Sequence, residues 1–326
     1  VNLCGPSLTL ACRGADSVAE LTRHTAKLVK VICEMNADIA GLMELENNPS
    51  TSLSRLIAAL NAEPLCGPYQ YINTGTMGTD AIKVGLIYKP TAVAPLGAYA
   101  VLDDQSFTDP NLIGSPQNRP ALAQTFRDLA TSEDLLVVVN HFKSQGSSCG
   151  TGDDDTTTGQ GNCNLTRTLA AEAQAAWIAT DPTGTGVEHI LVTGDLNAYR
   201  YEDPIQAFVS SGYTDLVDTY VGASAYSYVF DGQLGYLDHA LGSASLLPYI
   251  TGMTIWHINA DESGLLDYND TVEDATESWF QVKPSSTPLY WPDPYRASDH
   301  DPKVIGLDLA TYTICLLYTS PSPRDG

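Results

Sequence analysis

Polar side chains of types that bind metal ions adjoin the ends of several apolar runs in the sequence. These residues are Glu44, His141, Asp195, Asn197, Asp299 and His300. Because strand ends meet at one edge of a sheet, side chains that emerge there reach a common crevice. Carboxylates with Asn and His, and no thiolates, form a hard ligand set that favours Mg²⁺ or Mn²⁺ over zinc. The pattern predicts a metal site at which a phosphate substrate would complete the ligand shell.

Two further features of the sequence concern proton transfer. His300 lies between Asp299 and Asp301, and neighbouring carboxylates favour the imidazolium over neutral imidazole, which suits a group that takes a proton. Asp238 is a further strand-like acid that would fix the tautomer of a nearby imidazole. Each of these residues alone also has an ordinary structural explanation, such as a turn, a cap or a satisfied buried His.

The elements that must position these residues follow from the apolar pattern. The expected helices cover residues 17–36, 51–61 and 164–179, and the expected strands cover 39–43, 82–88, 121–126, 135–139, 190–193 and 304–309. Helices and strands alternate at first and strands dominate later, which indicates a layered α/β sandwich around a mixed sheet. No repeat, proline-rich linker or shift in composition divides the chain, so we expect one domain.

The composition is that of an acidic globular chain. The 326 residues contain 39 Asp and Glu against 16 Lys and Arg, which gives a formal net charge of −23, and 43% of them are hydrophobic. This apolar content is enough for a large core and excludes a disordered chain. The longest apolar runs are far shorter than the ~20 residues of a membrane-spanning helix, so we expect no membrane span.

The cysteines predict an oxidising compartment. Residues 315–326 have neither a strand period nor a helix cap and resemble translated adapter sequence, so we treat them as a non-native tail. The other six cysteines fall in sequence as the local pairs Cys4/Cys12, Cys33/Cys66 and Cys149/Cys163. We expect three disulfides and an extracellular location, with the cell surface as the alternative in a longer protein. Six free thiols in a cytosolic enzyme are the alternative.

Five short motifs contain most of the residues named above. They are Gly41-Leu42-Met43-Glu44, Asn140-His141-Phe142-Lys143-Ser144, Gly194-Asp195-Leu196-Asn197, Tyr236-Leu237-Asp238-His239 and Ser298-Asp299-His300-Asp301-Pro302. In order and spacing they resemble the motif set of the endonuclease/exonuclease/phosphatase superfamily, which has the deoxyribonuclease-like fold. Stretches at 13–16, 78–83, 202–205 and 226–232 are similar to its secreted bacterial nuclease branch. The resemblance implies a four-layer α/β/β/α sandwich with two packed mixed sheets over residues 1–314.

The resemblance also implies which residues bind the metal ion and the nucleophile. Glu44 matches the Glu that binds the catalytic divalent ion, and Asp299 matches a second acid near the same ion. Asp195 and Asn197 match the pair that holds the nucleophile and the phosphoryl oxygens. These matches imply an enzyme that uses Mg²⁺ or Mn²⁺ to hydrolyse phosphodiester bonds.

Other matches concern proton transfer and phosphate binding. His300 matches the general base, Asp238 the acid that orients it, and His141 the donor to the phosphate or the leaving oxygen. Arg119 and Lys83 fall where the branch has basic residues that reach the scissile or a neighbouring phosphate. A surface ion pair for Arg119 and a solvent-facing strand position for Lys83 are the alternatives.

One part of the family pattern does not match this sequence. Members open with an apolar strand that carries an Asn of the metal site, whereas Val1-Asn2-Leu3-Cys4 is similar to the end of the loop that follows. We therefore expect the first core strand to be missing, which puts the activity of this truncated chain in doubt.

The expected substrate is extracellular DNA, with RNA as the other polynucleotide, and we infer no protein partner. The net charge of −23 opposes this, because DNA is a polyanion that basic patches usually bind. Saline surroundings would screen the repulsion to a few ångström. A phosphodiesterase of the same superfamily that acts on sphingomyelin or inositol phosphates is one alternative. An inactive binding module, organised by structural Ca²⁺ at Asp153-Asp154-Asp155, is the other.

Overall fold

A six-stranded sheet forms the centre of the molecule. The computed structural model describes residues 3–12, 14–15, 17–150, 152–155, 158–269 and 289–310, so Arg13 and the expected tail lie outside it. The strands of this sheet are β6 (Val93–Leu102), β7 (Ala121–Asp128), β8 (Asp134–His141), β9 (Ile190–Asp195), β10 (Tyr213–Asp215) and β13 (Asp238–Ser243). They lie in the order β10-β13-β9-β8-β7-β6. Only β8 and β9 are parallel, so their carboxyl ends share one edge.

A second layer of strands covers one face of this sheet. It contains β3 (Ile39–Glu46), β4 (Gln70–Tyr71) and β5 (Ile82–Tyr88), and the antiparallel pair β14 (Ile250–Ile255) and β15 (Lys303–Leu307). Leu86 and Ile250 of this layer share one apolar core with Val137 of the central sheet. Within the described ranges β3 pairs only with β5, and β15 only with β14. The missing first strand stays a prediction.

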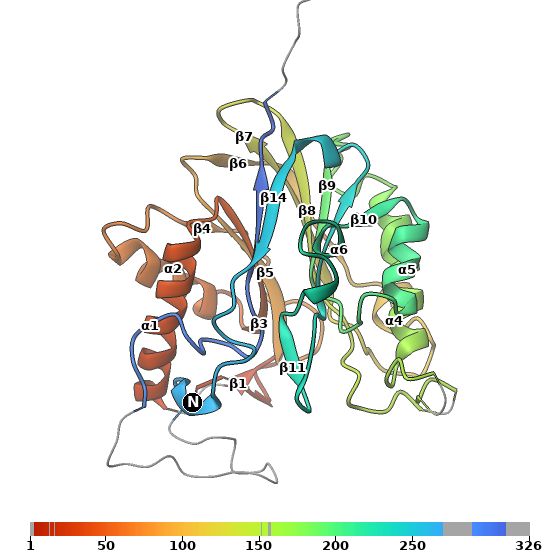
Figure 1. Ribbon diagram of the computed structural model, residues 1–326, viewed down its shortest axis with the longest axis horizontal. Helices are drawn as coiled ribbons and strands as arrows, with labels where there is room; N and C mark the ends of the chain where they lie inside the picture. Colours follow the sequence, from red (N-terminus) through yellow and green to blue (C-terminus); the bar gives the residue numbers. More distant parts are fainter. Residues whose placement is uncertain are drawn as a thin grey trace, which may run out of the picture.

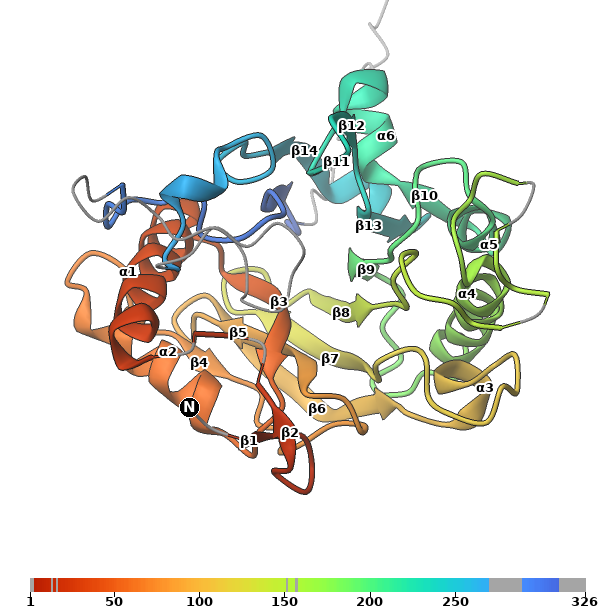
Figure 2. The same cartoon turned by 90° about the horizontal axis from the view of Figure 1, so that it is seen from below.

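Helices cover the outer faces of both layers (Figures 1 and 2). The longer helices are α1 (Val18–Met35), α2 (Thr51–Ala62), α4 (Asn164–Ile178) and α5 (Asp203–Ser210), and α3 (Gln105–Thr108) and α6 (Leu216–Tyr220) are short. A capping box starts α1, where Ser17 and Glu20 bond each other's backbone N–H. Helices α1 and α2 pack on β3 and β5, and α4 and α5 on the far face of the central sheet. The four-layer α/β/β/α sandwich is confirmed.

Short elements and disulfides complete the fold. The short strands are β1 (Leu3–Cys4), β2 (Leu10–Ala11), β11 (Tyr228–Phe230) and β12 (Gln233–Gly235), and the 3₁₀ turns are Gly222–Ser224, Leu247–Tyr249 and Gly264–Leu266. The three expected cysteine pairs are joined as disulfides. No helix in the described part of the chain is long and apolar enough to cross a membrane.

Candidate active site

Strand register places three of the expected site residues side by side. His141 ends β8 and is the register partner of Asp195, which ends the parallel strand β9. On the other side of β9, Asp195 pairs with Asp238 at the start of antiparallel β13. Neighbouring strands lie about 4.8 Å apart, so one imidazole and two carboxylates form a row across this edge of the sheet. The row is a product of the fold, because 97 residues separate its first and last members in the sequence.

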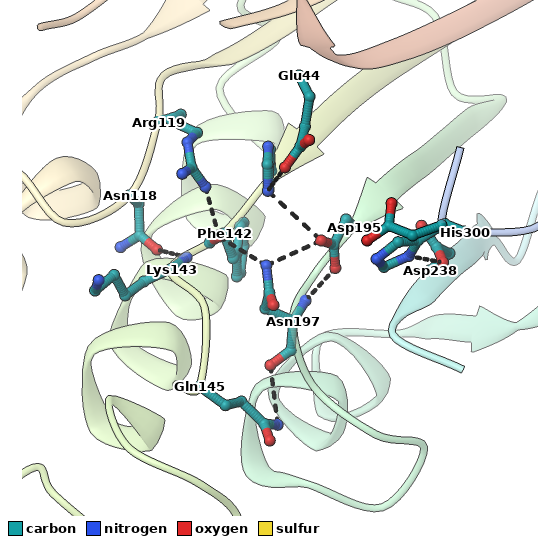
Figure 3. Close-up of polar contacts among 12 residues, drawn as sticks. Glu44, Asn118, Arg119, Phe142, Lys143, Gln145, Asp195, Asn197, Asp238 and His300 are labelled. Atoms are coloured by element: carbon teal, nitrogen blue, oxygen red, sulfur yellow. Dashed lines mark hydrogen bonds and ion pairs between the residues drawn. The ribbon is translucent and has the colours of Figure 1, made fainter. Parts of the chain in front are cut away.

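The second layer of strands contributes Glu44 to the same place. Its φ is 56°, and the pairing of β3 with β5 shifts register between Leu42 and Leu45, as at a β-bulge. A bulge redirects a side chain out of the alternation of a strand. Oε1 of Glu44 lies 3.8 Å from Nε2 of His141, and Oδ2 of Asp195 lies 3.5 Å from the same nitrogen (Figure 3). Acids from both layers therefore converge on one imidazole.

The turn after β9 fixes Asn197 against Asp195. Gly194 has a φ of 130°, and a Cβ there would lie 2.1 Å from the carbonyl oxygen of Asn140, so only glycine fits. The backbone N–H of Asn197 donates to Oδ1 of Asp195 at 2.8 Å, and its Nδ2 donates to Oδ2 at 3.0 Å. Nδ2 also donates to the carbonyl oxygen of Phe142 at 3.1 Å. The predicted Asp195/Asn197 pair is thus held as one rigid unit.

His300 and Asp238 form a partly buried ion pair at the far end of the row. Nδ1 of His300 lies 2.7 Å from Oδ2 of Asp238, which also accepts a hydrogen bond from Oγ of Ser227 at 2.6 Å. Burial by itself lowers the pKa of His300, but the charges of Asp238, Asp195 and Asp299 outweigh burial and raise it to about 10. The same pairing lowers the pKa of Asp238 against the effect of its burial. At neutral pH the pair therefore holds an imidazolium.

The remaining acids of the site differ in burial. Asp195 is 8% exposed, and burial together with the charge of Asp238 raises its pKa, while the charge of His300 lowers it. Asp299 is exposed and lies next to the pair, as its effect on the pKa of His300 shows. Asp301 serves the fold instead, because its carboxylate accepts hydrogen bonds from the backbone N–H groups of residues 258–260.

A cleft of about 630 Å³ lies beside the segment that follows His141 and includes Lys143 in its lining. It is lined by Arg119, Asn118 and Lys143, together with the acids Asp80 and Asp103. Nη1 of Arg119 donates to the carbonyl oxygen of Phe142 at 3.3 Å, and Asn197 donates to this same oxygen (Figure 3). Nε of Arg119 pairs with Asp80 at 2.9 Å. The structure therefore places Arg119 at the site, where a substrate phosphate would compete with Asp80 for it.

Lys83, the other basic residue predicted to reach phosphate, does not lie in the site. It is 1% exposed, and its Nζ donates to the carbonyl oxygens of Asn48 and Gly75. Burial lowers its pKa to about 8. The prediction was wrong because β5 is buried along its whole length, so neither of its faces is open to substrate.

Changing Lys83 to Met tests this assignment. We expect the melting temperature to fall, because two buried carbonyl oxygens lose their donor, at a cost of about 1 to 3 kcal/mol. The KM for any phosphodiester substrate should not change. Thermal denaturation followed by circular dichroism and steady-state kinetics measure the two quantities. A raised KM at unchanged melting temperature would instead support contact with phosphate.

The donor set of the site fits a divalent cation. The carboxylates of Glu44 and Asp195 face the same atom of His141, and the side chain of Glu44 is 66% exposed and open to a ligand. Oxygen ligands of this kind suit Mg²⁺ or Mn²⁺. Among the described residues, the three ligand-type side chains whose donor atoms all lie within 4.8 Å of one another are Cys4, Cys12 and Glu46, and the two cysteines are joined in a disulfide.

The three carboxylates of the acidic run 153–155 do not converge on a common point. Asp153 accepts hydrogen bonds from the first backbone N–H groups of α4, as a helix cap. Asp154 accepts from the N–H of Cys149, and Asp155 from those of residues 158, 159 and 161. The three carboxylates thus bind separate segments of their own loop. This arrangement offers no support for a calcium-organised surface.

Sequence reasoning missed two residues that contact the ion pair. Ser227 donates to Asp238, and the ring of Tyr228 stacks on that of His300 with centroids 4.5 Å apart. The stretch 226–232 stood out only by its resemblance to nuclease sequences. Its one local signal is Asp231-Gly232, a dipeptide typical of a tight hairpin turn, and this turn gives no indication of which side chain meets His300.

Comparisons with known proteins show the family of the chain. The family model described as "Endonuclease/Exonuclease/phosphatase family" matches residues 2–300. The chain therefore belongs to that family. It is a hydrolase of the family, whose members generally use divalent metal ions. No curated protein matches the sequence.

Solved structures share the fold at low sequence identity. A mannosyl-6-phosphatase of Bacteroides thetaiotaomicron has a TM-score of 0.55 and 15% identity over 91% of this chain and 97% of its own. The human nocturnin catalytic domain has a TM-score of 0.50 and 16% identity over 72% and 77% of the two chains. TDP2 of D. rerio, complexed with a single-strand DNA product, has a TM-score of 0.50 and 11% identity over 90% and 94%. These similarities show the fold alone.

Proposed function

We propose that the chain is a secreted, divalent-metal-dependent nuclease that hydrolyses phosphodiester bonds of extracellular DNA. One observation carries the proposal: Glu44, His141, Asp195 and the His300–Asp238 pair, which are far apart in the sequence, lie at one edge of the central sheet. Carboxylates beside imidazoles suit a reaction in which charge develops on phosphoryl oxygens.

Each residue of the site has its own role in hydrolysis. Asp195, fixed by Asn197, holds the attacking water and receives its proton. His141 donates to the phosphate or to the leaving oxygen, and His300 binds a phosphoryl oxygen as an imidazolium, since Asp238 keeps it charged. Glu44 and Asp195, with Asp299 nearby, would hold the divalent cation, which stabilises negative charge on the phosphate.

The cleft beside His141 supports a polymeric substrate. A phosphate monoester occupies only the catalytic centre, whereas a polynucleotide carries further phosphates on either side of the bond that is cut. Arg119 and Lys143 are the positively charged residues that line the cleft. They offer a place for such a phosphate despite the net charge of −23. The same residues would also contact the phosphates of RNA, because phosphates carry no information on base identity.

The disulfides support an extracellular location. Disulfides persist in secreted proteins and are rare in the reducing cytosol. Cys33–Cys66 joins α1 to the loop after α2, and Cys149–Cys163 closes the loop between β8 and α4. Three such bonds in one chain therefore fit a protein that works outside the cell.

Incubation with supercoiled plasmid tests the proposal. We expect nicked and linear DNA with Mg²⁺ or Mn²⁺, no cutting after treatment with a chelator, and full recovery when the metal is returned. An agarose gel measures the products. Parallel incubations contain RNA, sphingomyelin, an inositol phosphate and p-nitrophenyl phosphate. Release of phosphate or headgroup from the last three, with intact plasmid, would contradict the nuclease and favour another hydrolase of the family.

A further inference from the structure

An aromatic hairpin stands beside the catalytic pair. Strands β11 and β12 are joined by Asp231-Gly232, whose φ values of 49° and 75° are those of a tight hairpin turn. Figure 2 shows the hairpin next to β13 and α6. The ring of Tyr228 stacks on His300 with an interplanar angle of 26°. The hairpin thus begins at the centre of the site and extends outward.

The pairing of the two strands shows which side chains share a face. Side chains two apart on a strand lie on the same face, so Phe230 lies on the face of Tyr228 and His300. Leu234 pairs with Val229 and therefore lies on the opposite face. Phe230 is 64% exposed and Leu234 is 62% exposed. Two apolar side chains of almost equal exposure thus differ in whether they face the site.

The base of the hairpin is held firmly. Ser227 donates its hydroxyl to Asp238 and its N–H to the carbonyl oxygen of Gly235, and it accepts from the N–H of Asp301 at 2.8 Å. The ring of Tyr199 lies against Gly235, where a Cβ would come within 2.6 Å of a ring carbon. The face that bears Phe230 is therefore fixed in position relative to His300.

We propose that the Tyr228/Phe230 face is a stacking subsite for an unpaired nucleobase of the strand that is cut. The proposal rests on the proposed nuclease function and narrows it to single-stranded or locally opened substrate. An aromatic ring can stack on the flat side of any nucleobase, but that side of the base is accessible only when the base has left the DNA double helix. Stacking needs no positive charge, so it supplies affinity to an acidic protein that lacks excess cations.

Three variants test the subsite: Phe230→Ala, Phe230→Trp and Leu234→Ala. The probe is a fluorescent oligo(dT) strand, with its dissociation constant measured by anisotropy in chelator, where no cutting occurs. Phe230→Ala should raise this constant about tenfold, and Phe230→Trp should restore it. Leu234→Ala should leave it unchanged. With metal present, the ratio of the cutting rate on single-stranded DNA to that on duplex DNA should fall about tenfold for Phe230→Ala and should not change for the other two variants.

An abasic strand of the same length provides the decisive control. Removing the base and removing the ring of Phe230 each break the same stacking contact. Wild type and Phe230→Ala should therefore bind the abasic strand equally. Equal losses for Phe230→Ala and Leu234→Ala would overturn the subsite, as would wild type that does not bind oligo(dT). If oligo(dT) binds through Phe230 but no nucleic acid is cut with metal, the nuclease function fails and the subsite stands.

Discussion

Replacing His141 with alanine is expected to lower kcat on DNA by about a thousandfold, the upper range for one donor to a developing oxyanion. Nε2 of His141 lies 3.5 Å from Asp195 and 3.8 Å from Glu44, so this one nitrogen contacts both acids. The measured quantity is kcat on a labelled oligonucleotide at saturating Mg²⁺ or Mn²⁺. A His141→Gln variant retains the volume and one donor, and it should recover part of the loss.

His189 provides the matched control for this prediction. It precedes β9 at the end opposite to Asp195, and its ring meets that of Tyr249 with centroids 4.7 Å apart. His189→Gln should therefore keep full activity. Circular dichroism must show an unchanged fold for the variants of His141. If the purified, folded His141→Ala cuts DNA at the wild-type rate, His141 has no part in the chemistry.

Several core strands and the three longest helices were predictable because their sequences are locally consistent, whereas core strand β13 and helix α5 were not predicted. The run 135–139 lies within β8, and the Ala-rich segment 164–179 matches α4 (Asn164–Ile178) to within one residue. Edge strand β6 was not predicted. It is half exposed and is broken by Pro95 and Gly97, so it shows neither an apolar run nor a clean alternation.

The site was predictable to the extent that it depends on strand ends. His141 and Asp195 emerge where apolar runs stop, and parallel pairing of β8 with β9 brings them together. The orientation of a residue within a strand that is buried on both faces was not predictable, which is why Lys83 was misplaced. The contact of Tyr228 with His300 joins positions 72 residues apart and leaves no trace in either local sequence.

Replacing Asp238 with asparagine is expected to lower activity at pH 8 by about a hundredfold to ten-thousandfold, as loss of a carboxylate that holds a catalytic His does elsewhere. The pKa of His300 is raised to about 10 from 6.5, although burial opposes this. Without the charge of Asp238 the pKa of His300 should fall, because burial is then opposed only by Asp195 and Asp299, and less of His300 should be protonated at pH 8. Measurements are kcat between pH 5.5 and 9.5 and titration of His300 by nuclear magnetic resonance.

The sign of the pH dependence separates the two roles of His300. If the imidazolium binds phosphate, Asp238→Asn should regain activity as the pH falls, because acid restores the proton. A general base, the role implied by family resemblance, would require the neutral ring, and the variant would then gain relative to wild type as the pH rises. That second profile would remove His300 from the phosphate-binding role proposed above.

Stability should report the same ion pair independently of activity. The raised pKa of His300 contributes stability that is complete below pH 6.5 and is lost as the pH rises through about 10. The lowered pKa of Asp238 contributes stability that is complete above pH 3.8 and is lost in more acidic solution. The difference in melting temperature between wild type and Asp238→Asn should therefore be widest between these two pH values and shrink towards pH 10. A difference that does not vary with pH would mean that the two groups are not an ion pair in the folded protein, and the imidazolium that we assign to the site would lose its main source of stabilisation.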